Sequence, residues 1–85
     1  MSGFIGLWEM FLKIELYFKL SLDTTQRGSI THALYPLSDK NRHNITKNEI
    51  KQCLQGVVIL KDKALNEKLL IYIENYINEN IKDML

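Results

Sequence analysis

The stretch Leu22-Asp23-Thr24-Thr25-Gln26-Arg27-Gly28-Ser29-Ile30-Thr31 lies between a long apolar segment and a polar region without a regular pattern. Three of its positions are distinctive: an Asp, a Gly five residues later and an Ile two residues after the Gly. A Gly allows a sharp turn of the backbone, and polar residues such as Asp and Thr cap helices. The stretch is therefore predicted to be a loop that joins two helices.

The apolar segment before this loop, residues 4–22, is predicted to form the first helix. Its charged residues are Glu9, Lys13, Glu15 and Lys19. On a helix these charges fall within one arc of about 160°, because successive residues are rotated by about 100°. The remaining surface is apolar, so the helix is expected to be buried on more than one side. Residues expected in the core, or in the core plus a partner surface, are Trp8, Phe11, Leu12, Phe18 and Leu22.

Two further helices are predicted in the second half of the chain. Thr46-Lys47-Asn48-Glu49 has the sequence of a capping box, in which the Thr and Glu side chains bond each other's backbone amides. Helical spacing over residues 47–60 is shown by Ile50, Cys53, Leu54, Val57 and Val58. Asp62 can cap a third helix over 63–83, with the apolar stripe Leu65, Leu69, Ile73, Tyr76, Ile77, Ile81 and Met84. The two patterns could also join as one helix from 47 to 84.

Residues 23–46 are predicted to be mostly irregular. They contain Gly28, the only Pro at position 36, and a polar run over 38–44. The apolar residues 30–37 are predicted to form one helical turn or a brief strand, which Pro36 ends. At 85 residues the chain is expected to be one small domain, 1–85, of the all-α class, with three to four helices around one core.

The stretch that begins at Asp23 resembles the loop of the EF-hand, calmodulin-like superfamily. Counted from Asp23, the acidic first position, Gly28 at the sixth and Ile30 at the eighth match that loop. The resemblance covers residues 11–60 at most and implies helix–loop–helix elements. Arg27 stands at the fifth position and Leu34 at the twelfth, where oxygen ligands are needed, so we expect a degenerate loop that holds no metal.

A second stretch, 39–49, is the alternative calcium site. It contains Asp39, Asn41 and Glu49 before a helix, but it is one residue short and lacks the Gly. Its Ile-Thr pair lies only 15 residues after the first one, whereas two helices separate the loops of paired EF-hands. Two interpretations remain: both stretches are loops that only connect helices, or 39–49 serves a calcium-sensing regulatory protein.

Composition and motifs argue against several classes of function. The formal net charge of +1, from 11 basic and 10 acidic residues, predicts no attraction to nucleic acid or an anionic membrane. The single Cys53 excludes an internal disulfide and a cysteine zinc cluster, and is expected to be a small buried residue. His32 and His43 are expected in loops, and nothing in the sequence places either beside Cys53. We find no catalytic or cofactor-binding motif, so neither enzyme activity nor a cofactor is expected. The lack of a secretory signal predicts a cytoplasmic protein.

The sequence predicts a non-catalytic helical interaction module, such as a regulatory subunit, that binds a protein partner or associates with itself. The reason is that the first helix carries more apolar residues than two shorter helices can cover. The residues expected to bind the partner are Leu7, Trp8, Phe11, Leu12, Tyr17 and Phe18. A membrane-associated small subunit that uses residues 4–22 is a further alternative, although four charges oppose insertion into a bilayer.

Overall fold

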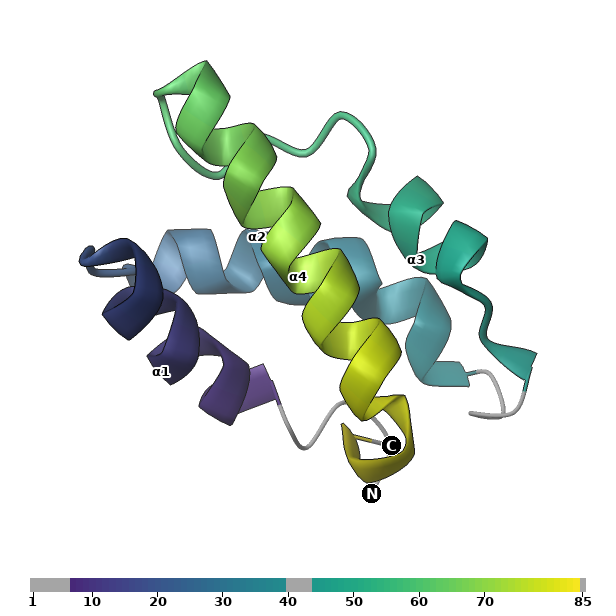
Figure 1. Cartoon of the computed structure of the whole chain (residues 1–85). Coiled ribbons are helices and arrows are strands. Elements are labelled where there is room, and N and C mark those ends of the chain that lie inside the picture. Colours follow the sequence, from purple (N-terminus) through teal and green to yellow (C-terminus); the bar gives the residue numbers. More distant parts are fainter. Residues whose placement is uncertain (1–6, 40–43, 85) are drawn as a thin grey trace.

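The computed structural model of the protein describes residues 7–39 and 44–84. Its elements are α1 (Leu7–Phe18), α2 (Thr24–Leu34), the 3₁₀ helix η1 (Tyr35–Asp39), α3 (Lys47–Leu54) and α4 (Lys63–Met84). These residues contain no strand, so the predicted all-α class with three to four helices is confirmed. In Figure 1, α4 lies between α1 and α3 and packs against both, while α2 packs against α3.

α1 ends at Phe18, four residues before the predicted end at 22. Lys19 has the left-handed backbone conformation, with φ of 55°. The N–H of Leu20 donates to the carbonyl of Glu15 at 3.2 Å, which is the pattern of a Schellman motif. Leu22 is still buried, but it reaches the core from the connection that follows the helix. The predicted residues 4–6 of this helix lie outside the described residues.

α2 occupies residues that were predicted to be irregular, and that prediction is wrong for 24–34. The helix begins at a second capping box: Oδ1 of Asp23 accepts from the N–H of Gln26 at 2.7 Å, and Oε1 of Gln26 accepts from the N–H of Asp23 at 2.9 Å. Gly28 lies inside the helix rather than at a turn, and a Cβ there would meet no atom within 4 Å beyond its chain neighbours and the backbone of its own helix. α2 ends at Leu34, shortly before Pro36, because a proline does not continue an α-helix. The predicted helical turn or strand at 30–37 is instead the end of α2 followed by η1.

The structure confirms the start of α3 but shortens it. The capping box is present, with Glu49 N–H donating to Oγ1 of Thr46 and Thr46 N–H donating to Oε1 of Glu49, both at 3.2 Å. The helix ends at Leu54 instead of 60, and Gly56 adopts φ of 78°, which favours glycine. Val58 is therefore not on a helix face, and it is 75% exposed.

α4 agrees closely with the predicted helix over 63–83, and the alternative of one helix from 47 to 84 is wrong. Asp62 caps α4 as expected, because its Oδ1 accepts from the N–H of Leu65 at 3.1 Å. The stripe residues Leu69, Ile73 and Ile77 are buried. The side chains at positions 81 and 84 of the predicted stripe lie outside what the structure describes.

The connection between α3 and α4 is held by Asn66, which is 7% exposed. Its Oδ1 accepts from the N–H groups of Ile59 at 2.7 Å and Leu60 at 2.9 Å, and its Nδ2 donates to the carbonyl of Val57 at 3.0 Å. Gln26 of α2 also donates to the carbonyl of Ile59, at 3.2 Å. The backbone of this irregular segment is thus paired with side chains of two helices.

One core joins all four α-helices. Its buried apolar residues are Leu7, Met10, Phe11, Ile14, Leu22, Ile30, Leu34, Leu37, Ile50, Leu54, Ile59, Leu69, Ile73 and Ile77. Of the residues expected in the core, Phe11 and Leu22 are among them and Phe18 is half-buried against them, whereas Trp8 and Leu12 are exposed. Cys53, predicted to be buried, is only half-buried at the edge of this core.

Candidate functional site

α1 has two faces of different character. One face carries Leu7, Met10, Phe11 and Ile14, all of which are buried against the rest of the chain. These residues lie in the arc that the charges of the helix leave free. The positions of the charges along the sequence therefore mark which side of α1 faces the core.

The other face of α1 carries three apolar side chains in a row, Trp8, Leu12 and Leu16, which we call the α1 stripe. Their exposed fractions are 62%, 45% and 79%. Residues four positions apart lie on neighbouring turns of the same helix face, so the three side chains form one continuous strip. Solvent covers most of this strip in the single chain.

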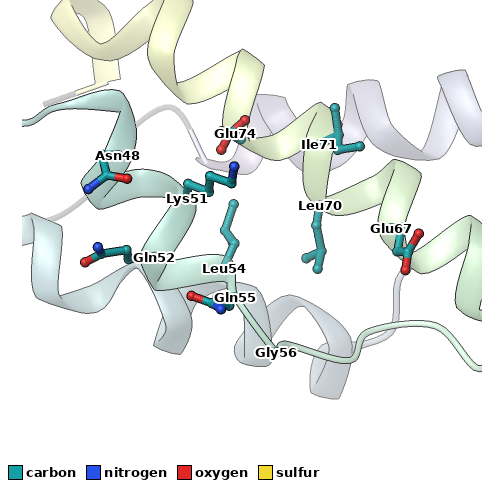
Figure 2. A pocket seen from close by; sticks show the side chains of 10 residues that line it. All are labelled: Asn48, Lys51, Gln52, Leu54, Gln55, Gly56, Glu67, Leu70, Ile71 and Glu74. Atoms are coloured by element: carbon teal, nitrogen blue, oxygen red, sulfur yellow. The ribbon is translucent and has the colours of Figure 1, made fainter.

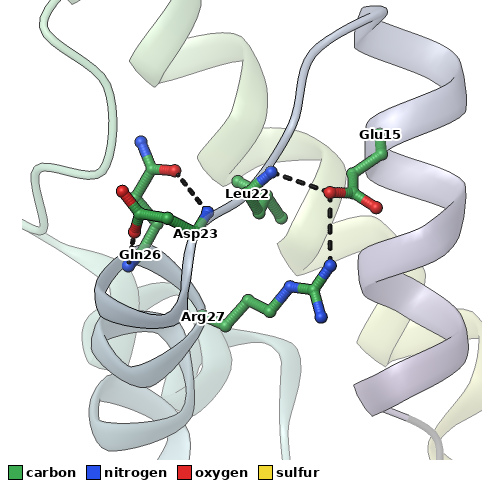
Figure 3. Close-up of polar contacts among 5 residues, drawn as sticks. All are labelled: Glu15, Leu22, Asp23, Gln26 and Arg27. Atoms are coloured by element: carbon green, nitrogen blue, oxygen red, sulfur yellow. Dashed lines mark hydrogen bonds and ion pairs between the residues drawn. The ribbon is translucent and has the colours of Figure 1, made fainter.

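Arg27 of α2 borders the stripe on one side. Its guanidinium lies 5.0 Å from the ring centroid of Trp8 and 5.8 Å from that of Phe11. Its Nη2 also forms an ion pair with Oε2 of Glu15 at 3.2 Å, as Figure 3 shows. A cation–π contact of this kind contributes about 0.5–1 kcal/mol at an exposed site. Arg27 thus restrains the indole of Trp8 and joins α2 to α1.

Glu15 is the polar link between α1 and the start of α2. Its Oε2 accepts a hydrogen bond from the N–H of Leu22 at 2.8 Å in addition to the contact with Arg27 (Figure 3). The hydrogen bond from Leu22 is the main cause that lowers the pKa of Glu15 below its ordinary value of 4.5, and Arg27 lowers it further. Both contacts favour the ionised carboxylate, so this link is strongest when Glu15 is charged.

A cluster of aromatic side chains lies where α1 meets α4. Tyr17 stacks on Tyr72 with ring centroids 5.1 Å apart, and Phe18 meets Tyr72 edge-on at 5.7 Å. Lys13 lies over the ring of Tyr76, 5.3 Å from its centroid. Burial raises the pKa of Tyr72 above its ordinary value. This cluster gives Tyr17 and Phe18 a role in packing within the chain.

The six residues predicted to bind a partner do not form one surface. Leu7 and Phe11 belong to the core, and Phe18 is half-buried against it. The other three are exposed on α1: Trp8, Leu12 and Tyr17. Of these, Trp8 and Leu12 lie on the α1 stripe, whereas Tyr17 lies beside α4.

Leu16 is the most exposed member of the α1 stripe, and the predicted set omits it. The sequence contained the signal that would have included it. Leu16 lies four residues after Leu12 and inside the arc that holds the charges, whereas Leu7 and Phe11 lie in the arc without charges. The helical phase of the charges, rather than the size of the side chain, separates the two faces.

The first EF-hand-like stretch is not arranged around a cation. Asp23 caps α2, and Arg27 pairs with Glu15. In the part of the chain that the structure describes, no group of three or more His, Cys, Asp or Glu side chains is placed to hold a metal ion. The alternative calcium loop at 39–49 includes 40–43, which lie outside the described residues.

The structure brings His32 and Cys53 to the lining of one shallow groove of about 530 Å³ between α2 and the segment around α3. Nothing in the sequence predicts that these two side chains line the same groove. His32 is on α2 rather than in the predicted loop, so its position follows from the unexpected helix. Activation of a thiol also needs a hydrogen bond to the base and a group that orients it, and a shared groove alone does not supply these.

Among the described residues, none of the helices combines the length and apolar character needed to cross a membrane. Comparison of the chain with protein-family models, with curated proteins and with solved structures gave no match. Function is therefore inferred from the residues and their geometry.

Proposed function

We propose that this chain is a non-catalytic helical interaction module that binds a protein partner, or a second copy of itself, through the α1 stripe. The observation that carries this proposal is the exposure of Trp8, Leu12 and Leu16 on a helix whose opposite face forms the core. Contiguous exposed apolar patches of this kind on small soluble domains are commonly interaction sites.

The stripe has the geometry of a helix that docks into a groove or against another helix. Such helices present apolar residues on successive turns, and Trp is among the residue types that contribute most to binding. The contact between Arg27 and Trp8 restricts the indole before any partner arrives. A side chain that is already ordered loses less entropy when it binds.

Charged side chains flank the stripe on both sides. Glu15 and Arg27 pair on one side, and Glu9 and Lys13 form an exposed ion pair at 3.4 Å on the other. An apolar centre with a polar rim is the usual arrangement of a protein–protein interface. The stripe therefore has the composition of an interface as well as its shape.

Calcium is not part of the proposed function. In the first EF-hand-like stretch, Asp23 is already used as a helix cap and Arg27 adds a positive charge.

The test uses Leu16→Glu, because a side chain that is 79% exposed contributes little to folding. Val58→Glu is the matched control: Val58 is 75% exposed but lies in the connection between α3 and α4. Sedimentation velocity over a concentration series measures self-association, and cross-linking in an extract of the native cell measures binding to a partner. We expect Leu16→Glu to weaken the association at least about tenfold while circular dichroism and melting stay near wild type, and Val58→Glu to leave it unchanged.

Two outcomes would contradict the proposal. In the first, Leu16→Glu and the wild type associate equally well. In the second, the wild-type chain is monomeric at every concentration and is cross-linked to nothing in the extract. Either result would make the exposed face of α1 an ordinary solvated surface.

A further inference from the structure

A groove between α3 and α4 forms a second surface, separate from the α1 stripe. Its volume is about 560 Å³, which falls within the roughly 300–1,000 Å³ of typical ligand sites. Figure 2 shows side chains of α3 on one side of the groove and side chains of α4 on the other. The connection at Gln55 and Gly56 closes one end.

The α4 wall of the groove combines two carboxylates with apolar side chains. Glu67 and Glu74 are seven residues apart, which is about 10.5 Å along a helix. Leu70 and Ile71 lie between them and also line the groove, and Ile71 is 57% exposed. Among the residues that the structure describes, neither carboxylate has an ion-pair partner.

The α3 wall is polar and mostly uncharged. It presents the amide side chains of Asn48, Gln52 and Gln55 and one positive charge, Lys51. Leu54 supplies an apolar contact at the floor. Two carboxylates and one ammonium group give the groove a formal net charge of −1. The C-terminal end of α3 also lies at this groove, and helix C-termini favour positive charge.

We propose that this groove binds an amphipathic helix of a protein partner that carries two basic residues seven positions apart, with apolar residues between them. A helix aligned with α4 has the same rise per residue, so its two cations reach Glu67 and Glu74 together. Its intervening apolar residues meet Ile71, Leu70 and Leu54, as in other helix-in-groove complexes. The amides of the α3 wall hydrogen-bond to polar side chains at the edge of the bound helix.

Charge complementarity selects this occupant over others. An acidic or neutral helix would leave two carboxylates without partners beside a buried interface, which disfavours its binding. The positive charge of Lys51 repels a basic ligand, so Lys51 lowers the affinity of the groove for such a helix. The groove and the α1 stripe lie on different helices, so each proposal can fail without the other.

The experiment measures binding of the full chain to a labelled peptide by fluorescence anisotropy. The peptide has roughly 15 residues, the length at which an isolated helix starts to be stable. It carries leucines on one face and two lysines seven positions apart. A second peptide has glutamates in place of the lysines, and a third has the same composition in an order that is not amphipathic. We expect only the lysine peptide to bind, with an affinity that falls as salt is added and with helical circular dichroism in the complex.

Variants of the chain then assign the contacts. Glu67→Gln and Glu74→Gln should each weaken binding about threefold, as expected for exposed charge pairs, and Ile71→Ala should weaken it about tenfold. Lys51→Gln should strengthen binding about threefold because it removes the opposing charge. Glu79→Gln on α4 and Val58→Ala are the matched controls outside the groove, and both should bind as the wild type does. Each variant is checked for an unchanged melting temperature.

The proposal is overturned by any of four results. The lysine and glutamate peptides bind alike, the Glu67→Gln/Glu74→Gln double variant binds the lysine peptide as tightly as the wild type, or no peptide binds at millimolar concentration. A peptide that binds without becoming helical would also overturn it, since the groove would then accept an extended segment.

Discussion

Single polar residues decide how the irregular parts of this chain are held. Asn66 provides three hydrogen bonds to the backbone of the connection before α4, and Arg27 stacks on Trp8 while it pairs with Glu15. The Nε of Arg27 is buried without a hydrogen-bond partner, so its guanidinium is positioned by ring contacts and one ion pair. Asn66 replaces the backbone pairing that a helix would supply, whereas Arg27 joins side chains of two helices.

We predict that Asn66→Ala lowers the free energy of unfolding by about 2–4 kcal/mol, because it leaves the buried N–H of Ile59 and the partly buried N–H of Leu60 and carbonyl of Val57 without these partners. Urea denaturation measures this change. Asn75→Ala, at an exposed position of α4, is the control and should change stability by less than about 0.5 kcal/mol. Equal effects of the two substitutions would show that Asn66 does not organise the connection.

The helices of this protein depend on their ends as much as on their apolar stripes. α2 has a weak apolar pattern, yet it forms because Asp23 and Gln26 cap it and because Ile30 and Leu34 are buried. Its first turn is joined to α1 through Glu15, which accepts from both Leu22 and Arg27. The position of α2 relative to α1 is therefore linked to the charge of one carboxylate.

This link predicts a pH dependence. The pKa of Glu15 in the folded chain is lowered from 4.5, so its contribution to stability is fully present above 4.5 and is lost as the pH falls through the lowered value. Thermal unfolding followed by circular dichroism from about pH 6 to about pH 3 should show a smaller loss of stability for Glu15→Gln than for the wild type.

Glu79→Gln, which removes an exposed carboxylate of α4, is the control and should keep the wild-type dependence on pH. If Glu15→Gln instead follows the wild-type curve over this range, the carboxylate does not link α1 to α2.

At the scale of the whole molecule, one core is shared by four helices, and the two proposed surfaces lie on separate helices around it. The α1 stripe is apolar with a polar rim, while the groove between α3 and α4 combines apolar side chains with a net negative charge. Two surfaces of different chemistry are what we expect of the proposed interaction module, which would bring two partner segments together.

We predict that millimolar calcium does not change the melting temperature of the chain. A ligand at 100 times its dissociation constant would stabilise the fold by about 2.7 kcal/mol, which would raise the melting temperature of so small a domain by several degrees. Melting is compared in calcium, in magnesium and in chelator. A rise with calcium alone would restore the calcium-sensing alternative at 39–49.

The sequence by itself determined the features that depend on neighbours within one or two helical turns. The capping box at Thr46 and Glu49, the cap at Asp62 and the core phase of α1 and α4 are encoded locally, because their partners lie three or four residues apart. Asp23 and Gln26 also encode the capping box of α2 locally. The stretch resembles an EF-hand loop, however, and for that reason a loop was predicted there instead of a helix.

Only the tertiary structure decided the features that depend on distant residues. Gln26 donates to Ile59, 33 positions away, and Glu15 pairs with Arg27 across two helices. The groove between α3 and α4 likewise depends on which helix faces pack together. Local hydrogen bonds and helical phase fix the elements, whereas burial and long-range pairing fix how much of each face is left for a partner.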